Sequence, residues 1–139
     1  MIKNLLLVSL GLLIALQASA ADVVGQWRTI DDETGQPKSI VEIYEKGGKY
    51  YGKIATLLSR PSDTICEKCP GDLKGKPLVG MDVITGMVKK GDQYSGGKIM
   101  DPTKGKVYDC KFWLEGDNTL KLRGYLGFFY RTQTWQRVQ

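Results

Sequence analysis

Two cysteines separated by two residues, Cys66 and Cys69, have the spacing in this chain that is most often associated with chemistry. Such a pair can act as a redox dithiol, supply half of a metal site or form a structural disulfide. Redox pairs lie at a helix N-terminus in a βαβ context, and the sequence around this pair has no such pattern. A zinc site would have to recruit Cys110 and a carboxylate, because the chain contains no histidine. We therefore expect no catalytic dithiol, no metal and no other cofactor.

The lack of histidine also removes His-based acid–base catalysis and the Ser-His-Asp and Cys-His nucleophile pairs. Carboxylates could replace histidine in acid–base work, but here they fall in turns, as Asp31-Asp32-Glu33 does, or on predicted outward faces, as Asp109 does. Carboxylates in such positions commonly cap turns or remain solvated. The sequence thus predicts no catalytic residue and a protein that is not an enzyme.

The N-terminal segment has the pattern of a signal peptide. Lys3 precedes an apolar run at residues 5–16 that is too short to span a bilayer, and Ala-Ser-Ala at residues 18–20 provides the small residues that signal peptidase recognises. We expect residues 1–20 to be the signal peptide and residues 22–139 to be one domain of a periplasmic or secreted protein. The cleavage region has no cysteine to accept a lipid, and no later stretch is apolar enough for a membrane span.

Export places the cysteines in an oxidising compartment, which favours a disulfide. A bond between Cys66 and Cys69 closes a short loop. A bond from either to Cys110 closes a loop of about 40 residues, worth about 4 kcal/mol on the loop-entropy estimate. Cys110, however, belongs to a predicted interior face, where a free thiol behaves as a small hydrophobe. These considerations leave both pairings open.

Most segments between turn signals are short, rich in β-branched and aromatic residues, and bounded by Gly, Asp, Asn or Pro, which is typical of strands. The strands are predicted at residues 24–30, 39–45, 49–57, 81–89, 93–100, 106–114, 119–125 and 131–138. The longest connection, residues 58–78, contains Pro61, Pro70 and Pro77, which exclude a regular strand or helix through most of it. We expect this segment, which carries the cysteine pair, to be a structured flap.

Eight sequential strands avoid long exposed edges if they close on themselves. The predicted fold is therefore all-β, a single antiparallel up-and-down eight-stranded barrel. Alternation within residues 106–114 points Tyr108, Cys110, Phe112 and Leu114 inward. A barrel of this size is either filled by its own side chains or holds one small ligand, and the sequence leaves these alternatives open.

Candidate ligand-binding residues come from the predicted interior. Gly-x-Trp opens the first strand at Trp27, and the last strand carries two arginines. In lipocalin-like barrels such a pairing seals one end, with the indole packed under a guanidinium, and here Arg131 or Arg137 would supply that group. A ligand would contact the interior side chains, with one arginine as an anchor for an acidic head group: Trp27, Tyr108, Phe112, Leu120, Leu122, Trp135 and Arg131.

The charge pattern argues against a nucleic-acid partner. The chain has 20 Lys and Arg against 15 Asp and Glu, a net charge of +5, and the longest basic run in the predicted domain is Lys89-Lys90. Nucleic-acid binding would need a concentrated basic patch with aromatic platforms. Interspersed charges of this kind are ordinary for solubility.

Several motifs together resemble the bacterial domain of unknown function 2147 family. They are Gly-x-Trp at residues 25–27, Gly-Gly-Lys-Ile at 96–99, Asp-Pro-x-x-Gly-Lys-x-Tyr at 101–108, Arg-Gly-Tyr-Leu-Gly-Phe at 123–128 and Arg-Thr-Gln-Thr-Trp at 131–135. The resemblance covers essentially residues 22–139 and implies an exported, lipocalin-like barrel with a small hydrophobic ligand. Members often have the cysteine pair without a third cysteine, which implies a Cys66–Cys69 bond. Residues 127–131 are shorter than the Gly-Phe-x-x-x-Gly-Arg arrangement of many members, so the turn there is expected to differ.

The leading hypothesis is a binding protein for a small, largely apolar ligand such as a lipid or fatty acid. One alternative is a structural or interaction protein with a filled barrel that meets an envelope protein partner. The other is thiol–disulfide exchange through Cys66 and Cys69.

Overall fold

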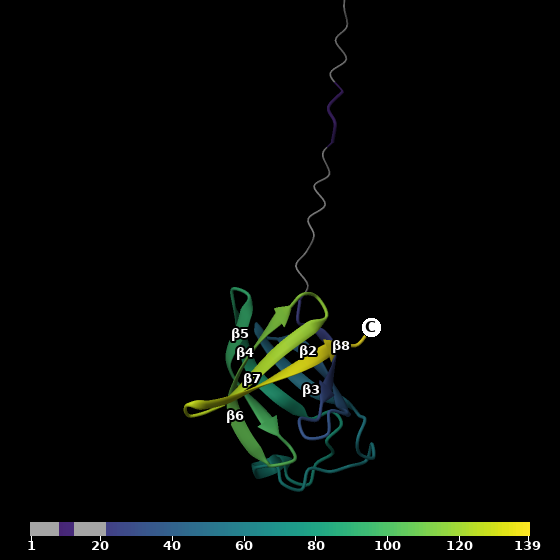
Figure 1. Cartoon of the computed structure of the whole chain (residues 1–139), viewed down its shortest axis with the longest axis vertical. Helices are drawn as coiled ribbons and strands as arrows, with labels where there is room; N and C mark the ends of the chain where they lie inside the picture. The colour runs from purple at the N-terminus through teal and green to yellow at the C-terminus, as the bar shows by residue number, and fades with distance from the viewer. Residues whose placement is uncertain (1–8, 13–21) are drawn as a thin grey trace, which may run out of the picture.

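Each strand pairs antiparallel with its neighbours in sequence, and the first strand pairs with the last to close a barrel (Figure 1). The computed structural model describes residues 9–12 and 22–139, so most of the predicted signal peptide, residues 1–20, lies outside the described residues. The strands are β1 (Gly25–Ile30), β2 (Pro37–Lys46), β3 (Lys49–Leu57), β4 (Asp82–Lys90), β5 (Gln93–Asp101), β6 (Lys106–Glu115), β7 (Thr119–Leu126) and β8 (Phe129–Arg137). The predicted all-β, up-and-down eight-stranded barrel is confirmed. Among the described residues, no helix is long and apolar enough to cross a membrane.

The β2–β3 turn shows how local sequence sets the strand order. Lys46 pairs with Lys49, which leaves Gly47 and Gly48 as a two-residue loop. Both glycines have positive φ, 60° and 77°, the backbone conformation that a type I′ hairpin turn requires at both positions. The chain therefore reverses here without a side-chain penalty.

The β7–β8 turn is equally short. Leu126 pairs with Phe129, and Gly127 has a φ of 59°. The last strand therefore begins at Phe129, two residues before the predicted start at residue 131, because only Gly127 and Phe128 are left outside the pairing. The sequence also predicts that this turn differs from the one formed by the longer Gly-Phe-x-x-x-Gly-Arg arrangement. That difference stays a prediction.

One end of the barrel is sealed by Trp27 and Arg137. The guanidinium carbon of Arg137 lies 4.3 Å from the centroid of the fully buried Trp27 ring. The guanidinium also donates to the carbonyl oxygens of Asp22, Val24 and Asp117, at 2.6, 3.1 and 2.8 Å. Of the two arginines that the sequence offered for this role, the structure selects Arg137.

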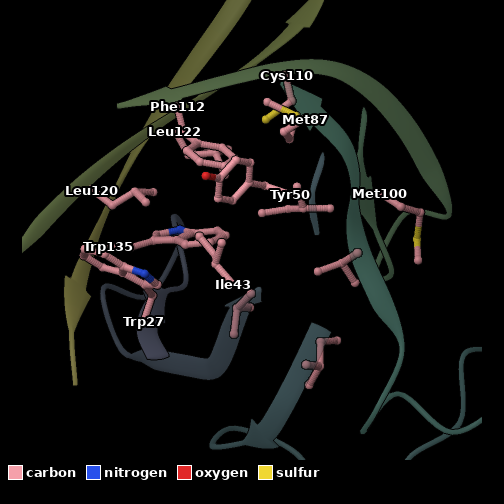
Figure 2. Packing of buried hydrophobic residues seen from close by; sticks show 14 of the residues in the cluster. Trp27, Ile43, Tyr50, Met87, Met100, Cys110, Phe112, Leu120, Leu122 and Trp135 are labelled. Carbon is pink, nitrogen blue, oxygen red and sulfur yellow. The ribbon is translucent and has the colours of Figure 1, made fainter. Parts of the chain in front are cut away.

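Next to this seal, aromatic side chains pack the adjoining half of the barrel (Figure 2). The rings of Tyr94 and Phe112 stack with centroids 5.0 Å apart, and Tyr50 meets Tyr94 edge-on at 4.9 Å. Cys110 and Phe112 are buried, as the alternation in β6 predicts, and Leu114 packs against the core from a half-buried position. The half of the barrel that contains Trp27 is thus a packed core.

The flap between β3 and β4 is held by the predicted disulfide, Cys66–Cys69, whose Cα atoms are 5.5 Å apart. A bridge between Ile65 and Pro77 and a short 3-10 helix, η1 (Gly71–Leu73), complete its structure. Both cysteines are almost fully buried, and the Cys69 Sγ lies 3.8 Å from the sulfur atoms of Met81 and Met100 in the hydrophobic core. Cys110 remains a free thiol, so the alternative pairing through Cys110 does not occur.

Candidate functional site

The end of the barrel opposite Trp27 holds a cavity of about 530 Å³. Its mouth lies between the β1–β2 turn, the flap, the β5–β6 turn and the β7–β8 hairpin. The walls are mainly apolar and include Val41, Ile54, Ile99, Leu122 and Trp135. Pockets for small molecules commonly have volumes of about 300 to 1,000 Å³ and apolar walls with a few polar groups, so this cavity fits the class.

The cavity exists because small residues occupy this half of the barrel. Gly124 lines it, and a Cβ built there would meet only the Tyr108 Cβ at 3.8 Å and the Ile99 Cγ2 at 3.9 Å, both ordinary contacts. Thr29 and Ser39 line it as well, with their hydroxyl oxygens 2.7 Å apart. These two buried hydroxyls give the apolar chamber a polar point on the β1–β2 side.

The structure divides the predicted ligand-binding residues into two groups. Four of them line the cavity: Tyr108, Leu122, Arg131 and Trp135. The other three are fully buried in the packed half and do not line it: Trp27, Phe112 and Leu120. The reason is that inward-facing residues of one strand lie at different depths along the barrel axis, and alternation specifies the face but not the depth. Ligand contact by any of the seven stays a prediction.

A chain of polar contacts runs from the cavity wall to its mouth. The indole Nε1 of Trp135 donates to the Gln133 Oε1 at 3.0 Å, and the Gln133 Nε2 donates to the Asp32 Oδ2 at 3.0 Å. The same carboxylate oxygen lies 3.4 Å from the Arg131 Nη1. Arg131 therefore sits at the rim, with 68% of its side chain exposed, and its cationic group already has a carboxylate partner.

Sequence reasoning missed Asp32 and Gln133. Residues 131, 133 and 135 alternate along one face of β8, so the period of two that selected Arg131 and Trp135 also selects Gln133. Asp32 was assigned to a turn, which is correct, since it lies between β1 and β2. No local signal shows that this turn bends over the mouth toward β8.

Burial and hydrogen bonds shift the pKa values of several ionisable groups in the barrel. Burial raises the pKa of the Cys110 thiol to about 12, which keeps it protonated at neutral pH. Backbone N–H groups of Thr34 and Glu33 donate to the Asp31 carboxylate and lower its pKa. Across residues 9–12 and 22–139, no three His, Cys, Asp or Glu side chains are grouped as metal ligands. The site is suited to holding a molecule by shape, apolar contact and a few rim charges.

A closed antiparallel barrel with a packed base and a hollow, loop-bordered end is a lipocalin-like fold. The chain matches, over residues 25–137, the family described as "Uncharacterized protein conserved in bacteria (DUF2147)", and it belongs to that family. The resemblance seen in the sequence motifs is thereby confirmed.

A solved structure supports the fold assignment. It is described as "Protein HP1028 from the human pathogen Helicobacter pylori belongs to the lipocalin family". The similarity has a TM-score of 0.77 at 21% sequence identity and covers 86% of this chain and 85% of that chain. A search of curated proteins finds no match.

Proposed function

We propose that this chain is a non-enzymatic, periplasmic or secreted protein that binds one small, largely apolar molecule of the lipid or fatty-acid type. The observation that carries the proposal is the cavity of about 530 Å³ with apolar walls and charged residues at its mouth. Burying ten methylene groups contributes about 8 kcal/mol before ordering costs, and each further buried methylene adds about 0.8 kcal/mol toward offsetting those costs.

The orientation of such a ligand follows from the distribution of polar groups. An alkyl chain would lie against Ile54, Leu122 and Trp135, and an acidic head group would remain at the mouth within reach of Arg131. Arg131 is largely exposed, so the head group would keep much of its hydration. A ligand carboxylate would compete with Asp32 for the guanidinium.

Two alternatives draw less support. The scaffold alternative predicts a barrel filled by its own side chains, whereas this barrel has a cavity of about 530 Å³ at one end. Thiol–disulfide exchange through Cys66 and Cys69 would require access to the sulfur atoms, and these cysteines are 1% and 3% exposed. A partner protein remains compatible with ligand binding.

The test of the proposal is a substitution that fills the cavity with a larger side chain. Gly124→Leu should add a side chain to the chamber without a backbone clash, since Gly124 has no positive φ and its nearest neighbours are at 3.8 and 3.9 Å. A fluorescent fatty-acid analogue should bind the wild type saturably and the variant at least tenfold more weakly. Gln136→Leu, which adds the same side chain at an exposed position of β8, is the matched control and should bind normally.

The proposal would be contradicted if no apolar probe bound the folded wild type and native mass spectrometry of protein from its own envelope found no occupant in the cavity.

Export has a separate test. N-terminal sequencing of the envelope protein should give Ala21 or Asp22 as the first residue, and retention of residues 1–20 would show that the signal peptide was misidentified.

A further inference from the structure

The turn of the β7–β8 hairpin presents apolar side chains to solvent. Residues 126–130, which we call the hairpin tip, include Leu126, Phe128, Phe129 and Tyr130, with 62%, 102%, 80% and 61% of their surfaces exposed. The tip projects sideways from the barrel at the left of Figure 1. Neither the turn nor the barrel requires Phe128, because Gly127 supplies the positive φ and the Phe128 ring is fully exposed.

Positive charge accompanies the tip. From Thr119 to Arg137 the hairpin has no acidic residue. Of its four basic residues, Arg123 and Arg131 flank the tip, whereas Arg137 lies at the sealed end over Trp27. The guanidinium carbon of Arg123 lies 4.3 Å from the centroid of the Tyr130 ring, directly behind the tip. Asp32 pairs with Arg131, and Asp31 and Glu33 of the β1–β2 turn and Asp101 of β5 also line the cavity mouth beside the hairpin. The hairpin thus combines an aromatic end with cationic groups one to three residues behind it.

The tip is also continuous with the cavity mouth. Leu126, Phe129 and Tyr130 line the cavity as well as being exposed, whereas Phe128 does not line it. An apolar surface therefore runs from the interior to the outermost point of the hairpin. A molecule leaving or entering the cavity along this surface would stay in contact with apolar side chains.

We propose that the hairpin tip docks on an anionic lipid bilayer, with Phe128 and Phe129 in the interfacial region and Arg123 near the phosphate groups. Aromatic side chains favour the membrane–water interface, and basic residues beside them are attracted to anionic lipids. The inference rests on the proposed function, because docking there turns the cavity mouth toward the membrane that would supply an apolar ligand.

A bilayer suits this surface better than a protein partner does. Four exposed side chains of this size offer on the order of 500 Å² of apolar area. A stable protein–protein interface buries about 800 Å² on each partner. The tip is also a narrow projection rather than a broad face, and a bilayer accepts a projecting wedge without matching its shape.

The experiment measures partitioning of residues 22–139, which contain every strand of the described chain, onto vesicles of phosphatidylethanolamine and phosphatidylglycerol. We expect flotation of the wild type, with a partition coefficient that falls roughly tenfold in Phe128→Ser, since one phenyl ring leaves the interface. Val24→Ser removes an exposed apolar side chain near the sealed end and should partition as the wild type does. Vesicles of phosphatidylcholine alone, or high salt, should weaken binding.

A second variant reports the depth of the tip directly. Phe128→Trp should show a blue-shifted emission and quenching by brominated lipids, and Val24→Trp should show neither. Three results would each overturn the proposal. The wild type does not float with the vesicles, the partition coefficient falls equally in Phe128→Ser and Val24→Ser, or Phe128 causes self-association in place of flotation.

Binding of the fatty-acid analogue in the absence of vesicles separates this inference from the proposed function. Phe128→Ser should keep wild-type affinity for the analogue, since Phe128 lies outside the cavity lining. Vesicle docking without analogue binding would contradict the proposed ligand-binding function and support a barrel that only docks on membranes. Analogue binding without vesicle docking would contradict the proposal that the hairpin tip binds membranes.

Discussion

The guanidinium of Arg137 lies over the indole of Trp27, with 4.3 Å between the guanidinium carbon and the ring centroid. The same two residues face each other across the β1–β8 pairing. The indole Nε1 donates to the Val23 carbonyl at 2.8 Å, so the ring is fixed from both sides. This stacked pair closes the base of the barrel and joins its first and last strands.

Trp27→Ala should therefore lower the free energy of unfolding by about 3 to 5 kcal/mol, because it empties a fully buried aromatic site. Urea denaturation followed by far-UV circular dichroism measures the change. Lys121→Ala, a shortened side chain on the outer surface of the barrel, is a control that should cost far less. A loss below about 1 kcal/mol in Trp27→Ala would show that the base is not held by this ring.

Arg131→Gln should weaken a fatty acid about tenfold while leaving the corresponding fatty alcohol nearly unchanged, since only the acid loses charge-assisted hydrogen bonds. Asp32→Asn should strengthen the acid, because it removes the carboxylate that lies 3.4 Å from the guanidinium. Titrations with both probes measure these effects. Arg123→Gln is the matched control, as Arg123 does not line the cavity. Equal weakening of acid and alcohol would exclude Arg131 as the anchor.

Cys110 should not react with thiol reagents in the folded protein at pH 8, because burial raises the pKa of its thiol to about 12. It should react fully once the protein is unfolded. Stability should also respond to pH. Above the ordinary pKa of 9.0 the unfolded chain releases this proton while the folded chain keeps it, so the free energy of unfolding falls as pH rises from 9 toward 12.

Cys110→Ala tests that pH dependence, since its free energy of unfolding should fall less steeply between about pH 8 and 10 than that of the wild type. Tyr44, whose pKa is raised to about 12 by burial and its hydrogen bond to Asp82, contributes in the same direction at higher pH in both proteins. Identical slopes for wild type and variant below pH 10 would show that Cys110 is accessible to water.

Replacing Cys66 and Cys69 by alanine should cost about 2 kcal/mol, the loop-entropy value for so short a loop, and should leave the barrel folded. The reduction potential of the wild-type disulfide should lie below about −300 mV, as expected for a structural bond. A potential in the range of catalytic dithiols would instead favour the redox alternative. Equilibration with glutathione or dithiothreitol buffers, read by mass spectrometry after thiol alkylation, provides the measurement.

The fold was predictable from the sequence because its determinants are local. Alternation marks the inward faces, and turn residues such as Gly47 and Gly48 fix where each strand ends. The depth of the cavity was not predictable, since it depends on which strands bring large side chains to the same level. Phe112 meets Tyr94 in the packed half, while Gly124 leaves space in the other half. These relationships join residues that are distant in sequence and have no local signature.

The position of the Trp27–Arg137 pair also bears on how the barrel forms. Every other strand pairing joins consecutive segments of the chain, whereas β1 and β8 meet across about 110 residues and through two residue pairs. Closing so long a loop is entropically more demanding than forming any of the hairpins. We therefore expect the hairpins to assemble early and the β1–β8 pairing to form late. Because that pairing brings the two ends of the domain together, a circular permutant with new termini in the flap would make the β1–β8 pairing local and transfer the long-range closure to β3 and β4.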